Sequence, residues 1–145
     1  MTFKWLSICA ALLCATAALA HKGVTNPAVM ARMNGMSAIA DGVKVLGTMA
    51  KGQIAFDQAS AREAASAIAR HSAESVALFT PEESDPKSEA LPAIWQNFDD
   101  FTAKARALEV LASDLATSIT SLEDVQAGMG PLGASCKSCH SAYRE

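Results

Sequence analysis

Apolar residues recur along the chain at spacings of three and four, a pattern that predicts amphipathic α-helices rather than β-strands. The most regular series runs over 94–119, where the apolar positions alternate steps of four and three. A second regular series covers 122–143, and shorter ones fall within 29–47 and 57–79. The sequence therefore predicts an all-α protein of four helices.

Residues with capping chemistry stand at the ends of these series. Asn26 followed by Pro27 suits the start of the first helix, because asparagine caps exposed N–H groups and proline is favoured at the first helical position. Gly52 suits the end of the same helix. Ser121 and Asp124 have the spacing of a weak capping box, which predicts that the last helix begins there.

Prolines mark two further places along the chain. The longest connection between predicted helices is 80–92, which contains three prolines. Pro131 lies inside the last apolar series, close to Gly130 and Gly133. Because proline lacks an N–H and clashes with the preceding turn, we expect it to kink or interrupt the last helix.

The first twenty residues have the pattern of a secretory signal peptide. Lys4 is followed by an apolar stretch over 6–19, and Ala18-Leu19-Ala20 suits a cleavage site. The apolar stretch is too short for a comfortable membrane anchor, and no later segment replaces it. We therefore expect residues 1–20 to be removed and 21–145 to form one exported domain with no membrane span.

The charge balance limits the choice of partners. Removing 1–20 leaves 125 of the 145 residues and takes away one of the 12 basic side chains. The remaining chain has 11 basic and 15 acidic residues, a net charge of −4 with His neutral. The charges are spread along the chain, and no basic stripe for nucleic acid or anionic lipid is evident. Proteins or small molecules are the expected partners.

A Cys-x-x-Cys-His motif lies five residues from the end of the sequence, at Cys136, Cys139 and His140. On a helix both thiols and the imidazole fall on one face, the arrangement that attaches a c-type haem through two thioether bonds and one axial nitrogen. A redox Cys-x-x-Cys requires a βαβ context, and a zinc site requires another Cys/His pair. Neither is present in 21–145. The motif predicts one covalent haem c per chain.

Other segments resemble the class II cytochromes c, which include cytochrome c′ and its low-spin relatives, and the resemblance covers essentially all of 21–145. It rests on Arg32-x-x-x-Met36, the segment 45–52, Phe56-Asp57, Ala93-Ile94-Trp95, and the haem motif followed by Tyr143-Arg144. The position of the motif near the C-terminus also distinguishes this chain from the class I cytochromes c, which carry the motif near the N-terminus. The resemblance implies an antiparallel four-helix bundle with up-down-up-down topology, of which cytochrome c′ is itself a standard example.

The resemblance also implies roles for five residues. His140 is the proximal iron ligand, and Met36 stands where methionine-ligated members place the distal ligand, although in cytochromes c′ the same position only covers the iron. Arg32, one turn from Met36, is expected either to reach a haem propionate or to be a solvated arginine on the surface. Arg144 is expected over the proximal side, unless the chain end frays. Trp95 is expected near the haem edge or simply in the core.

The function expected from these features is that of a periplasmic monohaem electron carrier with His140 and Met36 as ligands to iron. The alternative is a five-coordinate protein of the cytochrome c′ type that binds nitric oxide or carbon monoxide. An enzyme such as a peroxidase is disfavoured, because no distal His/Arg pair for acid–base chemistry is recognisable. Redox proteins are the expected partners, diatomic gases are the alternative, and the choice between monomer and homodimer stays open.

Overall fold

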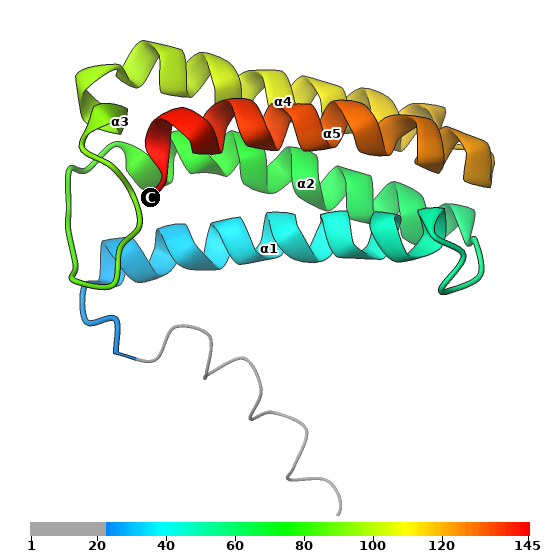
Figure 1. Ribbon diagram of the computed structural model, residues 1–145, viewed down its shortest axis with the longest axis horizontal. Helices are drawn as coiled ribbons and strands as arrows, with labels where there is room; N and C mark the ends of the chain where they lie inside the picture. The colour runs from blue at the N-terminus through cyan, green and yellow to red at the C-terminus, as the bar shows by residue number, and fades with distance from the viewer. Residues whose placement is uncertain (1–22) are drawn as a thin grey trace, which may run out of the picture.

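A computed structural model describes residues 23–145, so the expected leader at 1–20 lies outside the described residues. The described helices are α1 (Pro27–Ala50), α2 (Gln58–Phe79), α3 (Ala93–Gln96), α4 (Phe98–Ser118) and α5 (Leu122–Tyr143). The four long helices alternate in direction along the bundle (Figure 1). The prediction of an all-α, up-down-up-down four-helix bundle is therefore confirmed.

The helix ends follow the capping chemistry in the sequence. The Asn26 side chain accepts hydrogen bonds from the backbone N–H groups of Ala28 at 2.8 Å and Val29 at 3.1 Å. Gly52 has a φ of +67° just beyond the end of α1, a conformation that glycine adopts without steric cost. Ser121 and Asp124 form a complete capping box at the start of α5.

The long helix predicted over 94–119 is broken at Asn97. This residue leaves the helical region with φ −132° and ψ 46°, and its side-chain nitrogen donates to the Ala93 carbonyl at 3.2 Å. Asparagine breaks helices in this way because its side chain competes with the backbone for hydrogen bonds. Ile94 and Phe101 are buried on either side of the break, so the apolar spacing alone does not reveal it.

Of the two effects expected of Pro131, a kink or an interruption, the interruption does not occur. α5 continues from Leu122 to Tyr143 with Pro131 inside it. Pro131 is exposed, so its ring displaces none of the buried side chains of the bundle. Proline has no N–H, so the helix lacks one backbone hydrogen-bond donor at this position.

The core consists of two clusters of buried side chains. The larger lies between the four long helices and includes Leu46, Ile68, Ile119 and Leu132, each with no exposed surface. The smaller is largely aromatic and lies beside α3, where Phe79, Ile94, Phe101 and Tyr143 meet. The aromatic cluster therefore stands at the same end of the bundle as the C-terminus of α5.

The four long helices form a ring in which α1 contacts α2 and α5, and α4 contacts α2 and α5. Of these neighbouring pairs, α1 and α5 contact each other least. The start of α1 and the end of α5 lie at the same end of the bundle, next to the long connection between α2 and α3 (Figure 1). Within residues 23–145, none of the helices is long and apolar enough to cross a membrane.

Candidate functional site

A cavity of about 630 Å³ lies among α1, α2, α4 and α5 and is bordered at one end by residues 87–90. Its size is typical of cofactor pockets. On the α5 side the wall contains Cys136, Cys139 and His140, and on the α1 side it contains Met36. The fold thus brings the three motif residues and the predicted distal residue to one cavity.

The two motif thiols are in the state that covalent attachment requires. Cys136 and Cys139 are half-buried and free, without a disulfide between them. Burial is the main cause that raises the pKa of each thiol, so both are protonated at neutral pH. In the described part of the chain, no group of three or more His, Cys, Asp or Glu side chains could hold a metal ion.

His140 lies one residue after Cys139 on the same face of α5. Partial burial is the main cause that lowers the pKa of its imidazole, and Arg144 lowers it further while Glu89 opposes the change. The neutral imidazole is therefore favoured. That form keeps the lone pair with which histidine binds a metal.

Two methionines of α1 border the cavity, Met33 and Met36. From the sequence only Met36 is expected on the distal side, so the place of Met33 on the wall is a finding of the structure. Met36 is half-buried and packs against both core clusters. Of the other methionines on this helix, Met49 is buried in the larger cluster, and Met30 does not border the cavity. Flexible thioether side chains therefore form this part of the wall.

Arg32 borders the cavity, but three of its N–H donors are already used. It is 2% exposed, its Nε donates to the Leu78 carbonyl at 3.0 Å, and its Nη1 donates to the Glu83 carbonyl at 2.7 Å. Its Nη2 donates to the carbonyl of Pro81. An arginine has five such donors, so two remain for another group. In this structure the hydrogen bonds of Arg32 fix the segment that follows α2 against α1.

Trp95 packs against Arg32 and does not border the cavity. Its indole Nε1 donates to the Phe79 carbonyl at 2.7 Å. The Arg32 guanidinium lies 5.1 Å from the ring centre of Phe79 and 5.0 Å from that of Trp95, within the range of cation–π attraction. Of the two roles expected for Trp95, the structure favours packing support.

Arg144 borders the cavity and is held in place by an ion pair and by backbone contacts. Its Nε and Nη2 lie 2.6 Å and 2.5 Å from the same carboxylate oxygen of Glu89. Its backbone forms an isolated antiparallel bridge with Ala90, and the N–H of Glu145 donates to the Glu89 carbonyl at 3.0 Å. Fraying of the C-terminus, which competed with a role for Arg144, is therefore not what the structure shows.

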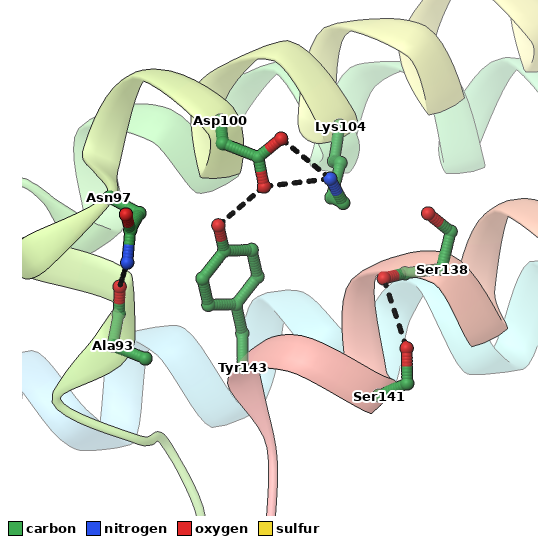
Figure 2. A network of polar contacts seen from close by, with 7 residues as sticks. All are labelled: Ala93, Asn97, Asp100, Lys104, Ser138, Ser141 and Tyr143. Carbon is green, nitrogen blue, oxygen red and sulfur yellow. Dashed lines mark hydrogen bonds and ion pairs between the residues drawn. The ribbon is translucent and has the colours of Figure 1, made fainter.

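A polar network beside the motif was not predicted from the sequence (Figure 2). The Tyr143 hydroxyl donates to Asp100 at 2.5 Å, and Lys104 Nζ lies 2.7 Å from both oxygens of the same carboxylate. Lys104 also borders the cavity. The spacing of Asp100 and Lys104 on one helix could have indicated their ion pair, but no local pattern indicates that Tyr143 joins them.

The charge on the cavity wall suits an anionic cofactor. Four cationic side chains border the cavity, against one carboxylate, although the whole chain has a net charge of −3. The cations are Arg32, Lys87, Lys104 and Arg144, and the carboxylate is Glu89. Together with two free thiols and a neutral imidazole, this wall fits a haem, which carries two propionates.

A four-helix bundle with a Cys-x-x-Cys-His motif on the wall of its cavity defines a class II c-type cytochrome. The family model described as Cytochrome C′ matches residues 27–144, so the chain belongs to the cytochrome c′ family. It is a haem electron carrier, and its cofactor is covalently attached haem c.

Named relatives agree with this assignment. The chain is 36% identical over 110 residues to cytochrome c-556 of Agrobacterium fabrum, with 75% of each chain covered. It is 40% identical over 120 residues to cytochrome c-554 of Cereibacter sphaeroides, covering 76% of this chain and 75% of the relative. The solved structure of cytochrome c′ from Rhodopseudomonas palustris superposes with a TM-score of 0.77 at 28% identity, covering 83% of this chain and 98% of that one.

Proposed function

We propose that this protein is a periplasmic one-electron carrier whose haem iron takes His140 as proximal ligand and Met36 as distal ligand. The observation that supports the proposal best is that Met36 on α1 and His140 on α5 border the same cavity as the two thiols. When bound, the haem supplies the one-electron couple between ferric and ferrous iron. The chain supplies attachment, ligands and exclusion of water.

Each residue of the wall has a distinct role in this proposal. Cys136 and Cys139 hold the cofactor covalently, so it is not lost when the ligands exchange. The thioether of Met36 is a soft ligand that favours ferrous iron and raises the reduction potential. Arg32 and Arg144, with the lysines of the wall, provide positive charge for the propionates, and Trp95 supports Arg32 from behind.

One observation supports a second candidate function. A nitrosyl complex of a variant of cytochrome c prime from Alcaligenes xylosoxidans superposes on this chain with a TM-score of 0.70 at 30% identity, covering 81% of this chain and 94% of that one. If Met36 covers the iron without bonding to it, the cavity can admit nitric oxide or carbon monoxide. The protein would then be five-coordinate at rest and bind such gases.

Absorption spectra of both oxidation states distinguish the two functions. Ligation by Met36 gives low-spin iron in both states and a weak near-infrared band from sulfur to ferric iron. Carbon monoxide must then displace an internal ligand, and its binding is slow. A resting protein that is high-spin in both states contradicts the carrier proposal and supports the gas-binding one.

The proposal includes export, with residues 1–20 as the cleaved leader and 21–145 as the mature haem domain. Its electron donors and acceptors are other redox proteins, and it has no catalytic residues of its own. Intact-mass measurement of the holoprotein from a periplasmic extract tests the export step. A mass for a chain beginning at His21 plus one haem is expected, whereas an uncleaved chain contradicts this part.

A further inference from the structure

The segment 80–91, which we call the strap, is hydrogen-bonded to the two residues that precede α1 and to Arg32 within α1. The buried carboxylate of Asp85 accepts hydrogen bonds from the Thr25 N–H at 2.8 Å, the Thr25 hydroxyl at 3.1 Å and the Asn26 N–H at 3.0 Å. The Lys87 N–H, followed by these donors from Thr25 and Asn26, lowers the pKa of Asp85 to about 2. Further along α1, Arg32 donates to strap carbonyls at Pro81 and Glu83.

The other end of the strap is bonded to the last turn of α5. The N–H of Leu91 donates to the Tyr143 carbonyl at 3.0 Å. Glu89 forms an ion pair with Arg144, and its carbonyl accepts from the Glu145 N–H at 3.0 Å. The strap therefore joins the two helices that contact each other least around the ring, α1 and α5.

Two of the attachment points lie within about one helical turn of the expected iron ligands. Arg32 is four residues before Met36 on α1, and Tyr143, whose carbonyl accepts from the Leu91 N–H, is three residues after His140 on α5. A helical turn is stiff enough to transmit the position of its neighbour. One short segment thus fixes the turns that carry both ligands, from opposite sides of the cavity.

We propose that the strap positions Met36 relative to His140, with Asp85 as its principal positioning residue, and so sets how often the distal side of the iron is open to a gas. The inference rests on the proposed ligation by Met36. With the strap intact, the sulfur stays in place and the open state is rare. When the strap is loosened, the open state becomes more populated, and gas binding speeds up in proportion.

Asp85 separates this role from direct contact with the cofactor. Arg32, Glu89 and Arg144 all border the cavity, so changing any of them also alters the surroundings of the haem. Asp85 does not border the cavity, and its carboxylate is occupied by backbone and hydroxyl donors. An effect of Asp85 on the iron must therefore pass through the strap.

The test compares Asp85→Asn with a matched control, Asp57→Asn, in the ferrous and ferric holoprotein. Asp57 caps α2 by accepting from the Ser60 N–H at 2.7 Å, and it does not border the cavity. Each substitution replaces one carboxylate oxygen by an amide NH2 group. In Asp57→Asn the remaining oxygen can still accept from the Ser60 N–H, whereas both oxygens of Asp85 accept from N–H groups, so Asp85→Asn loses hydrogen bonds. We expect Asp85→Asn to increase the rate of carbon monoxide binding about fivefold, the size expected from losing one hydrogen bond of ordinary strength, and Asp57→Asn to leave it unchanged.

Two further measurements keep the test decisive. The near-infrared sulfur band should disappear at a lower temperature in Asp85→Asn than in Asp57→Asn. Hydrogen exchange should accelerate over 29–36 and 140–144 together in Asp85→Asn alone. If Asp85→Asn does not fold, Thr25→Val, which removes only the hydroxyl donor, should shift all three readouts in the same direction by a smaller amount.

Equal effects of the two Asn variants, or no effect of either, would overturn the inference. Failure of the proposed ligation is recognised separately, because it appears in the wild-type spectrum before any variant is made. In that case exchange over 29–36 and 140–144 decides whether the strap couples the helices. Independent exchange of these two segments in Asp85→Asn would then reject the coupling itself.

Discussion

Tyr143 donates a 2.5 Å hydrogen bond to Asp100, which joins the last turn of α5 to the first turn of α4 (Figure 2). The ring of Tyr143 also meets that of Phe101 edge-on, with centres 5.7 Å apart. Tyr143 is three residues after His140, so the contact fixes the helical turn that carries the imidazole. The site is therefore held from α4 as well as from the strap.

The first prediction concerns Tyr143→Phe, which removes this hydrogen bond and keeps the ring. The bond to Asp100 raises the pKa of Tyr143 to about 12 from an ordinary 10.0, so its stabilising effect is fully present below pH 10. It is lost as the pH rises through about 12. In denaturant unfolding, the free energy of unfolding of the wild type should exceed that of Tyr143→Phe at neutral pH. This difference should disappear near pH 12.

A control for this prediction is Arg106→Gln, which breaks the exposed pair of Arg106 with Glu109 on the same helix. Exposed pairs of this kind contribute little, so the variant should match wild type across the range. A difference between wild type and Tyr143→Phe that persists unchanged at pH 12 would show that the phenol is not the titrating group.

The second prediction concerns attachment of the cofactor. Because Cys136 and Cys139 both border the cavity as free thiols, the wild-type protein should retain its colour after denaturation and acid–acetone extraction. In the double variant Cys136→Ala/Cys139→Ala, the colour should move to the solvent. Extraction of the wild-type colour would contradict the two thioether bonds.

The third prediction tests how closely α1 and α2 approach. A Cβ at Gly42 would lie 2.7 Å from a side-chain carbon of Ile68 and 2.9 Å from the backbone oxygen of Ala64. Gly42→Ala should therefore lower the free energy of unfolding by about 1–3 kcal/mol, measured with urea. At Gly47 the nearest atom, in Met129, would be 3.6 Å away, so Gly47→Ala should be neutral or stabilising. Equal losses in both would contradict the close approach.

The sequence predicts the helices and the haem motif because both depend on local spacing. The period of apolar residues determines which face is buried, and Cys136, Cys139 and His140 share a face through their spacing alone. The break at Asn97 cannot be predicted from local spacing, since the apolar period continues across it. The hydrogen-bond partners of Arg32 cannot be predicted in this way either, because the carbonyls of Pro81 and Glu83 come from a distant irregular segment.

The degree of burial of Leu108 also cannot be predicted from the apolar series, and it supplies the fourth prediction. It belongs to the apolar series of the third long helix, but in the structure it is half-buried and borders the cavity. Leu46 has no exposed surface and lies in the larger cluster. Leu46→Ala should therefore cost about 2–5 kcal/mol in urea unfolding, and Leu108→Ala clearly less. A larger loss at Leu108 would place it in the core.

The last prediction identifies the distal ligand among the methionines of α1. Met36→Ala should make the iron high-spin, remove the near-infrared sulfur band, lower the reduction potential and accelerate carbon monoxide binding, because no other ligand replaces the soft sulfur. Met30→Ala should change none of these, since Met30 does not border the cavity. Met33→Ala is the informative comparison, because Met33 borders the cavity three residues earlier. We expect the low-spin spectrum to survive this change with a small shift in potential. Loss of the sulfur band in Met33→Ala, with the band retained in Met36→Ala, would transfer the ligand role to Met33.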